Sequence, residues 1–261
     1  MAHRIRRNPA ALGVIALAVL FVSLGASFPH AQAPAKAPDA DKILERYVTA
    51  TGGRAAYDKL QNSVSKATLD IPSVGITIDL MVYSARPNKF RSIAQSPAIG
   101  SIERGTDGKI FWEKSIMQGA RILEGEELAD ALREAAFEGL AYWRTIYDSV
   151  AVAGVDTVAG SLCDKVVMKA KGGKPRTLFF DQKSGLITKT QSIASTQMGD
   201  IPIDAFISDY REVGGVLQAY KTVMSIMGQE RVITATSVEY NASIPDSVFA
   251  IPAEVQALMK K

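Results

Sequence analysis

Few side chains of this sequence could act as nucleophiles or general bases, and their positions limit the chemistry. The two histidines, His3 and His30, lie in an N-terminal segment with the features of an export signal, and Cys163 is the single cysteine. Removal of that segment leaves no imidazole, the side chain whose unperturbed pKa lies closest to neutrality. Ser-His-Asp and Cys-His catalytic sites, His-ligated zinc and a histidine proton shuttle are therefore not expected. We expect a binding protein without catalytic residues, cofactor or metal.

Carboxylates are the remaining candidates for chemistry. A predicted helix carries four of them, Glu126, Glu127, Glu134 and Glu138. Acidic residues are favoured in the first turn of a helix by its dipole, and carboxylates without a defined separation make no mechanism. Asp209-Tyr210-Arg211 is interpreted as an exposed ion pair beside a packed tyrosine. An enzyme that uses only carboxylates, serine and lysine is an alternative, and a screen for ester or glycan hydrolysis would test it.

The N-terminal segment has the parts of a secretory signal peptide in the right order. A basic start, with arginines at positions 4, 6 and 7, precedes seventeen apolar or small residues, Ala10 to Ala26. Small-residue cleavage sites follow near Ala33 and Ala35. We therefore predict that residues 1–35 are the signal peptide and cleavage region, and that the mature protein is periplasmic. An uncleaved membrane anchor is the alternative, because the apolar run lies at the lower edge of what spans a bilayer.

The predicted mature chain is close to neutral. The sequence has 30 basic and 27 acidic residues, and removal of three arginines with the signal leaves 27 of each. Because no basic stripe is present to gather phosphates, nucleic-acid binding is not expected. A lone cysteine forms no internal disulfide, so the fold must depend on its core. Residues 36–261 are long enough for a single well-cored domain.

Helices are predicted at the start of this domain and in its middle. Asp39 is suited to cap a helix whose apolar residues, from Ile43 to Val48, recur at helical spacing, and Gly52-Gly53 ends it. A second short helix is expected over residues 54–60. A helical insertion is predicted from Glu126 to Phe137, with an apolar face that continues after Gly139.

The rest of the domain has the pattern of strands and tight turns. From residue 63 onward, apolar residues alternate with polar ones, which predicts an antiparallel strand with one buried face over residues 76–82. Further strands are expected over residues 89–95, 101–104, 109–114, 162–170, 176–181, 186–193, 203–210, 219–227 and 231–240, with turns at Asp107-Gly108 and Gly214-Gly215. A sheet of this many strands must curl to bury one face. We predict an α+β, mainly β fold: a strongly curved antiparallel sheet whose concave face is covered by short helices.

Motifs spread over nearly the whole predicted domain resemble those of the LolA-like family of periplasmic lipoprotein-sorting and lipid-binding proteins. In chain order, they are Ile43-Leu44-Glu45-Arg46-Tyr47 with Thr51-Gly52-Gly53, Pro87-Asn88-Lys89-Phe90-Arg91, Thr106-Asp107-Gly108 with Trp112, Phe180-Asp181 with Ser184-Gly185-Leu186, and Asp209 to Val216. The resemblance implies a half-open barrel of antiparallel strands with helices as a lid and acyl chains held in an apolar interior.

We therefore predict a monomeric periplasmic carrier that binds lipid or lipoprotein acyl chains, exchanges them with envelope donor and acceptor proteins, and contacts membranes only transiently. Alternate positions on each strand are taken as inward-facing. This rule predicts a cavity wall of Ile76, Ile78, Leu80, Val82, Phe90, Ile110, Trp112, Leu178 and Phe180. The predicted lid is Leu128, Leu132, Leu140 and Trp143.

An envelope assembly or scaffold protein is the alternative function. In that case the curved sheet docks a protein partner and the interior is solid core. The size of the cavity distinguishes the two hypotheses.

Overall fold

The computed structural model describes residues 39–170, 172–196 and 199–260, all of which belong to the unit Ala37–Lys261. The predicted signal peptide, residues 1–35, lies outside the described residues. Within the described part of the chain, no helix combines the length and the apolar character that crossing a membrane requires.

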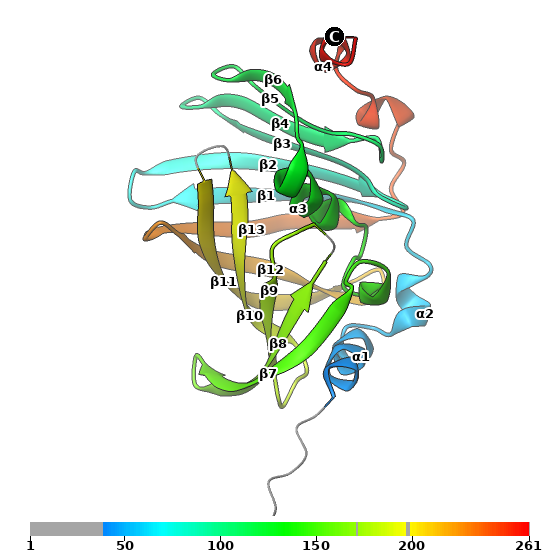
Figure 1. Cartoon of the computed structure of the whole chain (residues 1–261), viewed down its shortest axis with the longest axis vertical. Helices are drawn as coiled ribbons and strands as arrows, with labels where there is room; N and C mark the ends of the chain where they lie inside the picture. The colour runs from blue at the N-terminus through cyan, green and yellow to red at the C-terminus, as the bar shows by residue number, and fades with distance from the viewer. Residues whose placement is uncertain (1–38, 171, 197–198, 261) are drawn as a thin grey trace, which may run out of the picture. The chain divides into compact units, whose positions relative to one another are not determined.

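Thirteen antiparallel strands form one sheet (Figure 1). They are β1 (Asn62–Ile71), β2 (Ile76–Ala85), β3 (Lys89–Ser96), β4 (Gly100–Thr106), β5 (Phe111–Ser115), β6 (Gly119–Ile122), β7 (Ser149–Val158), β8 (Ser161–Lys169), β9 (Arg176–Asp181), β10 (Ile187–Thr196), β11 (Gly199–Val213), β12 (Val216–Ile226) and β13 (Gln229–Tyr240). Two meanders, β1 to β6 and β7 to β13, join where β1 pairs with β13. The edge strands are β6 and β7, and no pairing among the described residues closes the sheet.

The helices are short and few. They are α1 (Ala40–Ala50), α2 (Arg54–Tyr57), α3 (Gly125–Ala135) and α4 (Ala253–Leu258), with 3₁₀ turns η1 (Trp143–Thr145) and η2 (Asp246–Phe249). α3 contacts both β5 and β10, which lie eight places apart in the sheet order. Only a strongly curved sheet brings two such distant strands to one helix, and Figure 1 shows α3 on the hollow side. The predicted mainly β, curved antiparallel fold with short covering helices is confirmed.

α1 begins and ends where the sequence predicts. The Asp39 carboxylate accepts a hydrogen bond from the Asp41 backbone N–H at 3.2 Å, which makes Asp39 the N-cap. After the helix, Gly52 adopts a φ of +126°, and a Cβ there would lie 2.4 Å from the carbonyl oxygen of Gly215. Only glycine fits this close approach between α1 and the β11–β12 turn.

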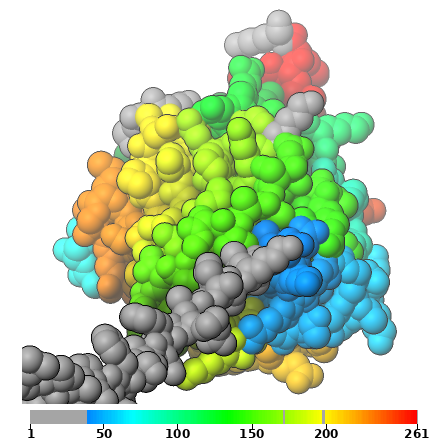
Figure 2. Space-filling view, turned by 60° about the horizontal axis from the view of Figure 1, so that its bottom comes forward, coloured from blue at the N-terminus to red at the C-terminus, as the bar shows by residue number. Residues whose placement is uncertain are grey.

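α1 covers one end of the concave face, over β8, β9 and β10. Val166, Leu178 and Phe180 are buried beneath Leu44 and Trp143. α1 also contacts the edge strand β7, and in the space-filling view α1 (blue) lies against the green segment that includes β7 (Figure 2). Each such buried side chain contributes about 1.5–3 kcal/mol of transfer free energy, so this cluster is a main part of the hydrophobic core.

Some elements differ from the predictions. The helix predicted over residues 126–137 stops at Ala135, because Ala136 has extended backbone angles (φ −61°, ψ 114°). The second helix covers residues 54–57 only. The edge strands β6 and β7 were not predicted as strands. β6 has only four residues, and β7 is exposed at most positions, so neither has a strong alternating apolar pattern.

Candidate functional site

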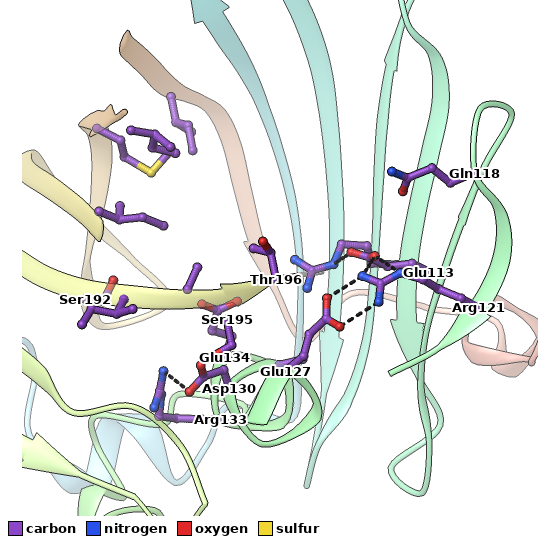
Figure 3. Close-up of a pocket in the computed structure, with 18 residues that line it drawn as sticks. Glu113, Gln118, Arg121, Glu127, Asp130, Arg133, Glu134, Ser192, Ser195 and Thr196 are labelled. Carbon is purple, nitrogen blue, oxygen red and sulfur yellow. Dashed lines mark hydrogen bonds and ion pairs between the residues drawn. The ribbon is translucent and has the colours of Figure 1, made fainter. Parts of the chain in front are cut away.

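A pocket with a volume of about 630 Å³ lies on the concave face (Figure 3). Residues of α3 form one side of it. Strands β4, β5 and β6 contribute a second side, and strands β10 to β13 contribute a third. The pocket therefore lies where the curved sheet brings its two halves to the same helix.

One wall of the pocket is apolar. Ile203 of β11 stands opposite Ile226 of β12, and Ile233 of β13 follows on the next strand. Met224 and Ala194 complete this wall. Residues directly opposite each other in an antiparallel ladder point to the same side of the sheet, so the register brings these side chains to one face.

The facing wall is charged. Cross-strand pairing places Arg104 of β4 opposite Glu113 of β5, and Glu113 opposite Arg121 of β6. Arg104 Nε lies 2.7 Å from Glu113 Oε1, and Arg121 Nε donates to Glu113 Oε2 at 2.9 Å. From α3, Glu127 Oε2 accepts from Arg121 Nη1 at 2.7 Å. Two arginines and two glutamates therefore form one mutually neutralised network that ties α3 to the strands.

The electrostatics of this network follow from its hydrogen bonds. The hydrogen bonds that Arg121 donates to Glu127 and then to Glu113 raise the pKa of Arg121 despite the opposing effect of burial. The bond from Arg121 lowers the pKa of Glu127 for the same reason. Both groups remain charged at neutral pH, so the charged wall offers donors and acceptors but little net field to a bound molecule.

The other end of α3 is held by hydrogen bonds to the backbone of Lys174, which Arg133 and Asp130 of the helix both contact. Arg133 Nη2 lies 2.9 Å from Asp130 Oδ1, and Arg133 Nη1 donates to the carbonyl oxygen of Lys174 at 3.0 Å. These contacts hold α3 against the connection between β8 and β9. Together with the bond between Arg121 and Glu127, they fix α3 at both ends over the pocket.

A smaller pocket of about 280 Å³ adjoins the first, because Arg133 and Glu134 line both. Glu138 lies in this second pocket and accepts a hydrogen bond from the Tyr240 hydroxyl at 2.7 Å. Burial raises the pKa of Glu138 although the hydrogen bonds from Tyr240 and Gln218 oppose that rise. The helix dipole therefore does not fully explain the glutamates around α3, because Glu127 and Glu138 each have a specific hydrogen-bond partner.

No group of three His, Cys, Asp or Glu side chains able to hold a metal ion occurs within residues 39–170, 172–196 and 199–260. Cys163 is buried, with Thr188 Oγ1 3.4 Å from its sulfur. Asp209 and Arg211 form an exposed ion pair of 2.7 Å.

The β2 row of the predicted wall lies on the concave face. Ile233 in the apolar wall pairs with Leu69, and Leu69 pairs with Ile78, so Ile78 faces the same side as the pocket. By alternation along β2, Ile76, Leu80 and Val82 share this face, and the pairing of Ser84 with Phe90 adds Phe90. None of these five residues lines the pocket itself.

Ile110 and Trp112 are not part of this row, which corrects the prediction. Phe90 pairs with Thr106, and Thr106 pairs with Phe111, so Phe111 is the residue of β5 that faces the concave side. The next residue of the strand, Trp112, points to the opposite side, and Ile110 lies before the strand begins. Trp112 is buried on the opposite face, where the Arg91 guanidinium lies 5.6 Å from the centroid of its ring. The strand begins at Phe111, and the positions predicted to face inward on this strand were wrong by one residue.

The remaining predicted residues occupy core and not the pocket. Leu178 and Phe180 are buried under α1, and Leu140 and Trp143 pack in the same cluster. Leu128 and Leu132 of α3 pack instead against a cluster that contains Phe111 and Leu123. The four predicted lid residues therefore contact two separate clusters and do not form one lid. The pocket is covered by other residues of α3, including Glu127, Asp130 and Ala131.

The pocket residues Arg104, Glu113 and Arg121 were not predicted from the sequence. Each lies on a different strand, and only the register of β4, β5 and β6 brings them together. The sequence contains no local signal for that register beyond the turn at Asp107-Gly108.

Comparison with protein-family models finds no match, and comparison with curated protein sequences finds none either. Solved structures, in contrast, share the fold over most of both chains. An outer membrane lipoprotein-sorting protein domain from Vibrio parahaemolyticus has a TM-score of 0.56 at 12% identity and covers 85% of this chain and 100% of its own. A LolA superfamily protein from Nitrosomonas europaea has a TM-score of 0.56 at 12% identity, with 82% and 99% covered.

A DUF1329 family protein from Desulfovibrio piger is also similar, with a TM-score of 0.55 at 14% identity over 81% of this chain and 97% of its own. The predicted likeness to LolA-like proteins is confirmed at the level of the fold. Sequence identities this low carry the fold alone, so the ligand must be argued from the pocket.

Proposed function

We propose that this protein is a non-enzymatic carrier that holds an acyl chain of a lipid or lipoprotein in the pocket between the curved sheet and α3. The observation that carries the proposal is the pocket of about 630 Å³ with one apolar and one charged wall. Its volume lies in the range of about 300–1,000 Å³ that is common for small-molecule sites. Two walls of opposite character suit an amphipathic guest, with its chain on the β10–β13 side and its polar group on the β4–β6 side.

Transfer of the chain out of water supplies the driving force. Each buried methylene contributes about 0.8 kcal/mol, so a sixteen-carbon chain that was fully buried would gain on the order of 10 kcal/mol. The pocket is only partly apolar, which reduces this gain. A reduced gain suits a carrier, because the guest must also be released. The neutralised Arg–Glu network suits a polar or zwitterionic head group.

The proposal extends to the cellular setting. The N-terminal sequence predicts export, and the fold is similar to that of a lipoprotein-sorting domain. We propose a monomeric periplasmic carrier that takes its guest from one envelope component and delivers it to another. The scaffold alternative requires a solid interior, and the pocket under α3 favours the carrier.

Native mass spectrometry of protein purified without detergent tests the proposal. We expect a bound species with the mass of a lipid in the unmodified protein. Met224→Trp should fill the pocket and remove the bound species. Val223→Trp is the matched control, because Val223 is the preceding residue of β12 and pairs with the exposed Phe206 on the opposite face.

Retention of lipid by the control and its loss from Met224→Trp, with both variants folded by circular dichroism, would support the carrier. Absence of lipid from the unmodified protein, together with failure to bind a fluorescent fatty acid, would exclude it.

A further inference from the structure

Four large apolar side chains are more exposed than any others in the described part of the chain. They are Val74 (57%), Met227 (76%), Ile116 (81%) and Met117 (87%). Each lies in a turn between two strands: β1–β2, β12–β13 or β5–β6. Exposed apolar side chains are ordinary when scattered, so their shared location in turns is the informative feature.

The three turns lie at the same end of the sheet. Asp70 pairs with Val232, which places the β12–β13 turn beside the β1–β2 turn. Strands β3, β4 and β5 follow β2 in the sheet as antiparallel neighbours, so the β5–β6 turn lies at this end as well. There the Ile116 side chain reaches the β3–β4 turn, because a Cβ on Gly100 would lie 2.8 Å from Ile116 Cδ1. We call Val74, Ile116, Met117 and Met227 the apolar rim.

Turns at the opposite end have a different composition. The β4–β5 connection contains Asp107, Gly108 and Lys109, and the β11–β12 turn is Gly214-Gly215. The β9–β10 connection, residues 182–186, includes Gln182, Lys183 and Ser184. The most exposed apolar side chains of the turns therefore lie at one end of the sheet.

The apolar rim adjoins the pocket. Gln118, next to Met117, lines the pocket, and so does Ile226, next to Met227. Ser195 and Thr196, which end β10 at the same end of the sheet, line it too. A guest that entered from this end would pass between the rim side chains and then reach the apolar wall.

We infer that the apolar rim docks on the surface of a phospholipid bilayer. The carrier would take up its guest from this bilayer or deliver its guest to it. This inference rests on the proposed function, because it assigns the rim to the entrance of the lipid pocket. The rim side chains stand on three separate turns, next to polar or glycine residues such as Ser73, Gln118 and Gly228. Separate projecting side chains need no complementary surface when they enter a fluid interface, whereas a protein partner would have to match each one.

Flotation with vesicles of zwitterionic phosphatidylcholine tests the inference, since these vesicles carry no net charge that could attract the protein by itself. The rim variant is Ile116→Ser with Met117→Ser. The matched control is Val155→Ser with Leu162→Ser, in the β7–β8 hairpin near the other end, where the two side chains are 51% and 53% exposed. All proteins share the same N-terminus, so any contribution from it cancels.

We expect the rim variant to partition onto vesicles about tenfold less than the unmodified protein, and the control to partition normally. A rim variant that floats like the unmodified protein, an equal loss in the control, or no vesicle binding by the unmodified protein would overturn the inference. Dissociation of a dimer by the rim variant in size-exclusion chromatography would assign the rim to a second copy and also overturn it.

A parallel titration with a fluorescent fatty acid, without vesicles, separates this inference from the proposed function. The rim variant should still bind the fatty acid, because neither Ile116 nor Met117 lines the pocket under α3. Normal fatty-acid binding with no vesicle binding by the unmodified protein would refute membrane docking alone. Failure of the unmodified protein to bind the fatty acid would refute the carrier, whatever the vesicles show.

Discussion

Arg121→Met removes the cation that joins β5 and α3 at the charged wall of the pocket. Arg121 donates to Glu113 on β5 and to Glu127 on α3, and its side chain is 22% exposed. Methionine keeps much of the side-chain volume but leaves two carboxylates facing each other without a shared donor. We expect the variant to fold and to be less stable, with α3 held less firmly over the pocket.

The magnitude follows from the partial burial of the network. Loss of a partner from charge-assisted hydrogen bonds costs about 1–3 kcal/mol, between the values for exposed and fully buried pairs. For a domain of this size, each kcal/mol corresponds to about 2–4 °C in Tm, so Tm should fall by roughly 2–12 °C at pH 7.

The pH dependence gives a second, independent signature. Because Arg121 lowers the pKa of Glu127 in the folded state, this pair contributes stability above the ordinary glutamate pKa of about 4.5. That contribution is lost as the pH falls through the lowered value. The unmodified protein should therefore lose more stability than Arg121→Met between pH 7 and pH 3, so the two stability curves converge at low pH.

Thermal unfolding followed by circular dichroism at a series of pH values measures both effects. Arg211→Met is the control, since the ion pair of Arg211 with Asp209 is exposed and should contribute less. Equal stability of Arg121→Met and the unmodified protein at pH 7, or a constant difference between them down to pH 3, would refute the reasoning.

Three further predictions concern the core and the backbone. Phe180→Ala removes a buried ring beneath α1 and should lower the free energy of unfolding in urea by about 3–5 kcal/mol; a loss under about 1 kcal/mol would show that this end is not tightly packed. Gly52→Ala forces a Cβ against the Gly215 carbonyl and should cost about 1–3 kcal/mol in the same assay, more than Gly53→Ala, which shares a positive φ (+80°) but has no atom within 4 Å of a new Cβ. Cys163 should react with a thiol reagent slowly in the native protein and rapidly in urea, and fast native labelling would contradict its burial.

The strand pattern of the sheet was largely predictable, because alternation is a local property. The run from Ile76 to Val82 gave the face of β2, and the pairing of Leu69 with Ile78 agrees with it. Asp39 and Gly52 likewise marked the ends of α1, since capping and tight turns depend on individual residues. The edge strands β6 and β7 were missed, because edges are exposed and need little apolar alternation.

The candidate site was much less predictable, because it depends on the register in which neighbouring strands pair. Trp112 was assigned to the interior by strand alternation, yet pairing of Thr106 with Phe111 puts it on the opposite face. Leu178 and Phe180 do lie inside, but α1 fills the space in front of them. The network of Arg104, Glu113 and Arg121 requires the register of three strands, which no local pattern specifies.

We propose that the acyl chain lies against the apolar wall formed by Ile203, Met224, Ile226 and Ile233. Photo-crosslinking with a fatty acid that carries a diazirine near the end of its chain tests this directly. We expect peptides from β11, β12 and β13 to be labelled at pocket-facing residues, and we expect unlabelled fatty acid to suppress the labelling. Labelling confined to the outer face, or labelling that excess fatty acid does not reduce, would contradict it.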